Sequence, residues 1–455
     1  MTSRRGETWL VIGLARSGAA AAGLLARQGA TVLGGDDAAE DDLRDRWERF
    51  GLADDLAALA ARRCGPGWWH DLPPLDGVVV SPGIPLDHPA LTALPPAVPV
   101  LGEVELAARA CAAPVVGITG TNGKTTTTEL TAHLLRTAGV DAVALGNVGR
   151  PFAAVADRLG PDQVVVLELS SFQLETVRRL SPRVAVVLNV APDHLDRYPD
   201  MAAYVAAKRR LAELLPADGL LVAGTDGPAR DWPAPRRRLF GDPAAGADVF
   251  VADGWLQRRR DGGRPEPVAA MAETALRGAP AVANTCAAVA AVTPWAVPAA
   301  ALAAGLRSFR PLPHRQEVVA EADGVTWVND SKATNVHAVL AGLAGYREGV
   351  VLILGGSGKG EDYSPLREAL APVAAVVLLG AEADRLAAAL AGAVPLERAA
   401  DMADAVRRAR RLVPPGGTVL LSPACASFDM FRDYRHRGEA FRAAVTDLLV
   451  QGGSA

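Results

Sequence analysis

The residue types best suited to chemistry stand together in one stretch, Gly117 to Thr126, which reads Gly-Ile-Thr-Gly-Thr-Asn-Gly-Lys-Thr-Thr. Before it, 114–116 is typical of the end of a buried strand, and after it the leucine spacing predicts a helix over 127–138. Glycines let backbone N–H groups close around a polyphosphate, and a helix N-terminus favours negative charge. The stretch therefore predicts a nucleotide phosphate loop.

Two side chains of this loop have definite roles in such a site. Lys124 would bring a point charge to the β- and γ-phosphates, and the Thr125 hydroxyl would hold Mg²⁺. The strict pattern places a glycine five positions before Gly123, where this chain has Ile118. The alternative is an ordinary glycine turn before a helix, but the strand, turn and helix together favour a nucleotide site.

Other candidate residues follow the next two predicted strands. Glu168 ends the apolar run 163–167, the usual place for a Mg²⁺ ligand beside a phosphate loop. His194 follows the strand predicted at 184–188; a single loop histidine is often a surface residue, and its position leaves both readings open. Lys208 lies on an amphipathic helix, and from the pattern alone it is a solvated lysine.

The N-terminal part predicts a βαβ unit, with strands at 8–13 and 30–33 and an alanine-rich helix between them. Its first turn is not a complete G-x-G-x-x-G, so it does not indicate a dinucleotide. A further strand is predicted at 77–80, and ligands bind along the carboxyl edge of such sheets. Prolines at 95, 96 and 99 predict a linker before Gly102.

The C-terminal part predicts a third α/β region from about Pro311. Strands are expected at 325–328, 350–354, 375–379 and 418–421, and the loops that follow the first, second and fourth are polar or glycine-rich. Such loops at one sheet edge indicate a second binding face. Between the two regions, 227–275 is expected to be irregular or edge structure, with a hairpin turn at Asp253-Gly254.

Composition narrows the class of protein. The chain has 455 residues, half of them hydrophobic, and a net charge of −4, which gives no basic footprint for nucleic acid. Its four cysteines have no paired spacing and are expected to be reduced thiols. Neither the polar N-terminus nor the proline-broken, alanine-rich stretch 279–306 predicts a signal peptide or membrane span. We expect a cytoplasmic, monomeric protein without nucleic-acid or membrane partners.

The motifs together resemble a known family. Gly117 to Thr126 resembles the ATP loop of the Mur ligases and their folylpolyglutamate synthetase relatives. Further segments are similar to the members that join D-glutamate to UDP-N-acetylmuramoyl-L-alanine, namely 168–175, 189–198, 312–315, 329–335 and 421–427.

The resemblance implies a three-domain α/β fold. It implies a Rossmann-like UDP-substrate domain over 1–102, a central P-loop ATPase-type domain with a parallel sheet over 103–310, and a Rossmann-like amino-acid-binding domain over 311–455. It also implies an ATP- and Mg²⁺-dependent ligase of peptidoglycan precursor synthesis. In that reaction UDP-MurNAc-L-Ala is activated as an acyl phosphate, and the amine of glutamate then displaces phosphate.

Site residues follow from the same resemblance. It implies catalytic roles for Lys124, Glu168, His194, Lys208 and Arg315, and Mg²⁺ ligation by Thr125, Glu168, His194 and Lys208, the last as a carbamate. The residues expected at ATP are Gly120, Thr121, Asn122, Gly123, Lys124, Thr125, Thr126, Asn284, Arg315, Asp330 and Lys332. Those expected at the UDP substrate are Arg16, Ser17, Asp36, Asp37, Ser81, Gly83, Asn147, Ser170 and Gln173. Those expected at the amino acid are Thr334, Lys359, Ser427 and Tyr434.

One segment departs from the family pattern. Where relatives have His and Asn before the third domain, this chain has Pro280 and Ala281, although Asn284 is kept. Two alternatives stay open at this point. The acceptor is L-glutamate in place of D-glutamate, or the chain is a homologue that binds ATP without catalysis.

Overall fold

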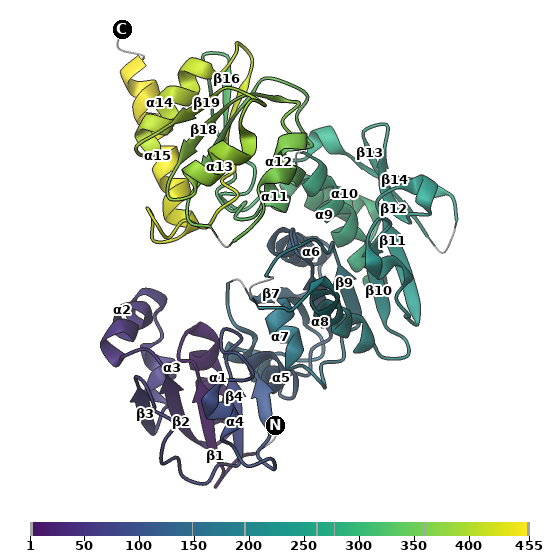
Figure 1. Ribbon diagram of the computed structural model, residues 1–455. Helices are drawn as coiled ribbons and strands as arrows, with labels where there is room; N and C mark the ends of the chain where they lie inside the picture. Colours follow the sequence, from purple (N-terminus) through teal and green to yellow (C-terminus); the bar gives the residue numbers. More distant parts are fainter. Residues whose placement is uncertain are drawn as a thin grey trace. The chain divides into compact units, whose positions relative to one another are not determined.

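The computed structural model describes residues 3–147, 149–194, 197–260, 263–276, 278–358 and 360–452 (Figure 1). Within these residues the chain forms three β-sheets. It divides into two compact units, which we describe separately. The first comprises Met1–Val190, Ala202–Ala269 and Cys286–Gly305, and the second Ala191–Met201, Ala270–Thr285 and Leu306–Ala455.

The N-terminal sheet has the order β3-β2-β1-β4-β5, and every adjacent pair is parallel. Its strands are β1 (Thr8–Ile12), β2 (Thr31–Asp36), β3 (Ala61–Cys64), β4 (Gly77–Val80) and β5 (Val100–Gly102). Its helices are α1 (Arg16–Arg27), α2 (Glu40–Phe50), α3 (Ala53–Ala57), α4 (Pro89–Thr92) and α5 (Glu103–Ala108). The predicted βαβ unit is confirmed. The linker prediction is wrong at its end, because 100–102 is a paired strand that continues directly into α5.

The central sheet has the order β14-β13-β12-β11-β10-β9-β6-β8-β7. Its strands are β6 (Val115–Thr119), β7 (Ala142–Gly146), β8 (Val164–Glu168), β9 (Val184–Val187), β10 (Leu220–Gly224), β11 (Arg236–Phe240), β12 (Val249–Ala252), β13 (Trp255–Arg259) and β14 (Pro265–Ala270). The helices of this part of the chain are α6 (Lys124–Thr137), α7 (Ser171–Glu175), α8 (Met201–Glu213), α9 (Gly278–Ala291) and α10 (Ala299–Ser308). The segment 227–275 supplies the edge strands, and its predicted hairpin turn is confirmed by left-handed φ angles of 51° at Asp253 and 76° at Gly254.

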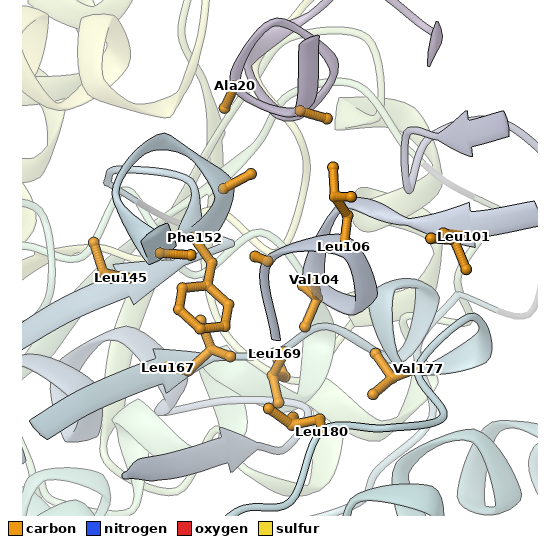
Figure 2. Close-up of a cluster of buried hydrophobic side chains, with 14 of the residues drawn as sticks. Ala20, Leu101, Val104, Leu106, Leu145, Phe152, Leu167, Leu169, Val177 and Leu180 are labelled. Atoms are coloured by element: carbon orange, nitrogen blue, oxygen red, sulfur yellow. The ribbon is translucent and has the colours of Figure 1, made fainter. Parts of the chain in front are cut away.

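The two sheets of the first unit share one hydrophobic core. In Figure 2, Ala20 of α1 faces a cluster from the central sheet that includes Phe152 and Leu167, with Val104 of α5 beside them. Phe152 begins the short 3₁₀ helix η1 (Phe152–Ala154), which packs on α1 and α5. A guanidinium–carboxylate pair between Arg27 and Asp157, at 2.9 Å and 3.0 Å, crosses the same junction. These two sheets are therefore joined by a continuous packed interior.

A carboxyl group is buried in that junction. Glu103, 1% exposed, accepts a 2.6 Å hydrogen bond from the Ala153 amide through Oε1, while its Oε2 is buried without a partner in the described structure. Burial disfavours the charged form and raises the pKa of Glu103 to about 7. Just before it, Gly102 has no room for a side chain, since a Cβ there would lie 2.0 Å from Thr176 Oγ1.

The third sheet has the order β15-β16-β20-β17-β18-β19, parallel except for the β15–β16 pair. Its strands are β15 (Glu317–Ala322), β16 (Val325–Asn329), β17 (Val350–Gly355), β18 (Val373–Leu379), β19 (Leu396–Arg398) and β20 (Thr418–Leu421). Residues of α11 (Val336–Leu343), α12 (Ser364–Glu368) and α13 (Ala383–Leu390) form the core on one face; α14 (Met402–Leu412) and α15 (Tyr434–Gly452) form the core on the other. The predicted three-part α/β fold is confirmed, whereas the domain boundaries at 102/103 and 310/311 stay a prediction.

One buried guanidinium holds the loops of three adjacent strands of this sheet. Arg437 of α15 is 1% exposed and donates to the Ser331 hydroxyl and carbonyl at 3.0 Å and 2.8 Å, after β16. Its Nη1 donates to the carbonyls of Cys425 and Ala426 after β20, at 3.1 Å and 3.0 Å, and to Gly355 at the end of β17, at 3.4 Å. Burial lowers the pKa of Arg437 to about 10. The polar loops are thus fixed to one another by a single side chain.

Replacing Glu103 with glutamine should change how stability depends on pH. Between the unfolded pKa of 4.5 and the folded pKa of about 7, Glu103 is protonated in the folded state but ionised in the unfolded state. The free energy of unfolding of the wild type therefore falls as pH rises through this window. In urea unfolding from pH 5 to pH 8, the stability of Glu103→Gln relative to wild type should rise by about 1 kcal/mol per pH unit up to pH 7 and then level off. Glu321→Gln, at an exposed site on β15, should give a constant difference. Parallel profiles for Glu103→Gln and wild type would contradict the burial.

Replacing Arg437 with lysine should destabilise the third sheet, although the charge is kept. An ammonium cannot reach all the carbonyls that the planar guanidinium serves, and each one left unpaired costs about 1–3 kcal/mol. Urea unfolding should show a loss of several kcal/mol, against a negligible change for Arg432→Lys at an exposed position of the same region. Equal stabilities for the two variants would refute the role of Arg437.

Candidate active site

The predicted phosphate loop connects β6 to α6 as expected. Gly123 has a φ of 86°, which glycine adopts without strain, and it is the N-cap of the 14-residue helix α6. Gly123 has no side chain with which to cap this helix N-terminus. The amides of its first turn are consequently oriented for an anion, as in nucleotide-binding loops.

Asn189 fixes the shape of the loop. Its carbonyl accepts the Thr121 amide at 3.0 Å, its Oδ1 accepts the Asn122 amide at 2.9 Å, and its Nδ2 donates to the Asn122 carbonyl at 3.1 Å. Asn189 is not among the predicted site residues. The available signal was its position directly after the strand run 184–188, because β9 lies next to β6 in the sheet.

Two lysines meet at one oxygen of the loop. Nζ of Lys124, from α6, donates to the carbonyls of Gly120 and Thr121 at 2.9 Å each. Nζ of Lys208, from α8, donates to the same Gly120 carbonyl at 2.9 Å and lies 4.4 Å from the centre of the Tyr204 ring. Lys208 is 1% exposed, so it is not the solvated lysine that its helix pattern alone predicts. The two ammonium groups lie within about 6 Å of each other, a separation at which like charges repel.

Glu168 lies on the neighbouring strand with one oxygen unused. The Asn147 side chain donates to Oε1 at 3.1 Å, whereas Oε2 is buried without a hydrogen-bond partner in the described structure, and Glu168 is 1% exposed. A buried carboxylate oxygen in this state suits a hard cation, and with the buried Thr125 it matches the Mg²⁺ donors of phosphate-loop proteins. Among the described residues no cluster of three or more Asp, Glu, His or Cys forms a metal site by itself.

The predicted UDP-substrate residues lie mostly at the carboxyl edge of the N-terminal sheet. Asp36 accepts the amides of Leu14 and Ala38 at 2.7 Å and 3.0 Å, and Ser81 donates to the Gly13 carbonyl at 2.7 Å. These two residues therefore brace the loop between β1 and α1. The remaining predicted residues here are Arg16 and Ser17 in the first turn of α1, Asp37 after β2, and Gly83 after β4.

Ser170 and Gln173 lie elsewhere, on α7 just after Glu168. They form a reciprocal capping box: the Ser170 hydroxyl accepts the Gln173 amide at 3.2 Å, and Gln173 Oε1 accepts the Ser170 amide at 2.9 Å. Their side chains thus begin α7, which fixes the backbone that follows Glu168.

The second unit holds the other two predicted catalytic residues, His194 and Arg315, and the predicted ATP-binding residue Asp330. His194 has a left-handed φ of 56°, and its Nε2 lies 3.6 Å from Asp193, which also accepts the Asn335 side-chain amide at 3.2 Å. Asp330 is buried, and burial raises its pKa to about 6. Gln316 donates to it from its side chain at 2.6 Å.

The predicted acceptor and nucleotide loops follow the strands of the third sheet. Lys332 Nζ lies 4.3 Å from the ring centre of Tyr434, and the Thr334 amide donates to the Lys332 carbonyl at 2.8 Å. Ser427 is buried and precedes the exposed Phe428. Asn284 is buried on α9, Arg315 precedes β15, and Lys359 lies outside the described residues.

Comparison with known proteins identifies the family of this chain. The family model described as the Mur ligase middle domain matches residues 118–292, and the one described as the Mur ligase glutamate ligase domain matches 314–425. The UDP-N-acetylmuramoylalanine--D-glutamate ligase of Anaeromyxobacter dehalogenans is 43% identical over 97% of this chain and 98% of its own length. That of Myxococcus xanthus is 44% identical over 97% and 99%.

Solved structures share the fold at lower identity. The MurF ligase of Thermotoga maritima, determined in complex with ADP, is 16% identical, with a TM-score of 0.60 over 92% of this chain and 95% of that one. The family assignment rests on the two relatives that are 43% and 44% identical to this chain over 97% of its length. The chain belongs to the Mur ligase family, in the group of the UDP-N-acetylmuramoylalanine--D-glutamate ligases.

Proposed function

We propose that this chain ligates D-glutamate to UDP-N-acetylmuramoyl-L-alanine at the expense of ATP, a step in peptidoglycan precursor synthesis. Membership of the D-glutamate ligase group supports the substrates. The loop before α6 is the observation that best supports this function. Its helix N-terminus and Lys124 can donate hydrogen bonds to a polyphosphate, and the unpaired oxygen of Glu168 lies on the neighbouring strand.

The reaction has two steps. The substrate carboxylate attacks the γ-phosphorus of ATP, the bond to the bridging oxygen breaks, and ADP leaves behind an acyl phosphate. The glutamate amine then attacks the acyl carbon, and phosphate leaves as the amide forms. Lys124 and Arg315 stabilise the charge on the transferred phosphoryl group. Asn147, which donates to Glu168, belongs to the side of the site that the muramoyl substrate enters.

Mg²⁺ is part of the proposal. Thr125 and Glu168 would hold it, and His194 and Lys208 would serve a second ion. When bound, Mg²⁺ neutralises charge on the phosphate oxygens. The buried, unpartnered oxygen of Glu168 supports this assignment, because a carboxylate oxygen without a donor is costly unless a cation is its partner.

Carbamylation of Lys208 is supported by electrostatics. As an ammonium it shares the Gly120 carbonyl with Lys124, so two like charges lie close together in a buried place. A carbamate removes that repulsion and supplies an anionic oxygen for the metal, while its nitrogen keeps one hydrogen that still donates to Gly120.

The remaining assignments follow the family motifs. The 1–102 domain binds the UDP part of the substrate, 103–310 binds ATP, and 311–455 binds the amino acid. Thr334, Lys359, Ser427 and Tyr434 surround the glutamate side chain, while Asn284, Asp330 and Lys332 lie on the nucleotide side. No helix within the described residues is long and apolar enough to cross a bilayer. We propose a monomeric enzyme of the cytoplasm that acts on small molecules.

A phosphate-release assay with UDP-MurNAc-L-Ala, ATP and a panel of amino acids tests the function. D-Glutamate should be strongly preferred over D-alanine and D-glutamine. An acceptor without the side-chain carboxylate leaves the charge-assisted hydrogen-bond donors of the site unpaired, which costs about 1.5–3 kcal/mol each. Lys124→Ala should lose about a hundredfold or more in rate. Faster phosphate release with L-glutamate than with D-glutamate would identify L-glutamate as the acceptor. ATP binding without phosphate release would mark a non-catalytic homologue.

Lys208→Ala should be nearly inactive, and a short carboxylic acid in the buffer should restore part of its rate by replacing the carbamate oxygen. Lys208→Arg keeps the positive charge but cannot be carbamylated, so it should remain inactive without the acid. A fully active Lys208→Ala enzyme would refute the role, and a fully active Lys208→Arg enzyme would refute the carbamate.

A further inference from the structure

The far edge of the central sheet carries two arginine runs that the ligase reaction does not use. One is 236–238 on β11, and the other is 258–260 at the end of β13; β12 lies between the two strands. Val249 of β12 pairs with Arg258 on one side and with Phe240 on the other. Paired residues lie on the same face of a sheet, and so does every second residue along a strand. Arg258 therefore shares a face with Arg260, two residues on, and with Arg238, two residues before Phe240.

Side-chain contacts agree with this register. Arg258 and Arg260 both donate through Nε to the same oxygen of Glu266, at 2.5 Å and 2.8 Å. Arg259, one residue out of phase, instead places its guanidinium 5.4 Å from the ring centre of Phe250, on the opposite face.

The arginine-bearing face borders a partly open cavity of about 190 Å³ within the first unit, which Arg259 and Thr293 also line. Its apolar wall comes from Val249 and from the end of α9 and the segment after it, including Val289 and Val297. The arginines supply the polar wall. A cavity of this size is smaller than the usual drug-sized ligand pocket, so it suits a compact ion and not a nucleoside.

One buried donor at this cavity has no hydrogen-bond partner among the described residues. Arg258, whose side chain is 11% exposed, donates through Nη1 to the Val297 carbonyl at 2.8 Å, and its Nη2 is buried without a hydrogen-bond partner. Arg238 donates to the Arg259 carbonyl at 2.6 Å and lies 3.4 Å from Asp248. Asp248 pairs with Arg238, and Glu266 pairs with Arg258 and Arg260.

We propose that Arg238, Arg258 and Arg260 form a binding site for a small tetrahedral oxyanion of the phosphate class. The planar fork of a guanidinium matches such oxygens, and an ion there would accept the unused Nη2 of Arg258. The site is separate from the ATP loop. Arg258 on β13 is five strand spacings from β6, about 24 Å at about 4.8 Å per spacing, and Arg238 on β11 is three spacings away, about 14 Å.

Phosphate titration of the full chain by calorimetry tests the site, with Lys124→Ala as the background that weakens the ATP loop. One phosphate should bind per chain, sulfate should compete with it, and acetate should not. Arg258→Gln and the more exposed Arg260→Gln should each raise the Kd at least about tenfold. Arg236→Gln, on β11 but outside the cavity lining, is the matched control and should leave the Kd unchanged.

A parallel titration with ADP shows whether the site binds free phosphate or the terminal phosphoryl group of a nucleotide. ADP binding that weakens in Arg258→Gln and Arg260→Gln would identify the ligand as a terminal phosphoryl group, whereas sensitivity of phosphate alone would identify the free ion. The proposal is overturned if the Lys124→Ala protein binds no phosphate, or if Arg260→Gln, with an unchanged circular dichroism spectrum, binds it as tightly as the Arg236→Gln control.

Discussion

The inner strands of all three sheets are buried on both faces, and this limits where polar chemistry can occur. β4 of the N-terminal sheet, β6 and β8 of the central sheet and β17 of the third sheet are buried at every residue. An unpaired polar group inside such a strand would lose its water without gaining a partner. Functional groups therefore collect where the pairing of parallel strands stops. Gly120, Glu168 and Asn189 each stand at or just after the end of a strand.

The same constraint creates carbonyl groups that need donors at the strand ends. In the central sheet, Gly120 receives two lysine ammonium groups, one from each of two helices. In the third sheet, Arg437 serves carbonyls from three loops. The two solutions differ in consequence. A planar guanidinium satisfies its loops by itself, whereas the two ammonium groups at Gly120 repel each other, a repulsion that the proposed carbamate of Lys208 would remove.

The strands and helices were predictable because they depend on local patterns. Buried parallel strands read as short apolar runs that end in glycine or polar residues, and the strands around Ile118, Val186 and Ile353 follow this pattern. The phosphate loop was predictable for the same reason, since its glycines and Lys124 are neighbours in sequence.

What could not be predicted depends on partners distant in sequence. Arg437 stands in a charged run with Arg435 and His436, which is typical of a solvated helix, and only the fold brings three loops around it. Glu103 likewise lies at the start of a helix, where an acid is ordinary, until η1 covers it. Tertiary packing, and not local preference, decides both cases.

The packed junction between the first two sheets also decides how the chain can be divided. Cutting the peptide bond after Gly102 would uncover the face of α1 at Ala20 and the ring of Phe152. It would also leave Arg27 and Asp157 on separate fragments. Freshly exposed apolar surface of this kind promotes aggregation. A fragment that keeps this interior intact must for this reason contain both sheets of the first unit, and a protease that cuts this junction should release no stable N-terminal fragment.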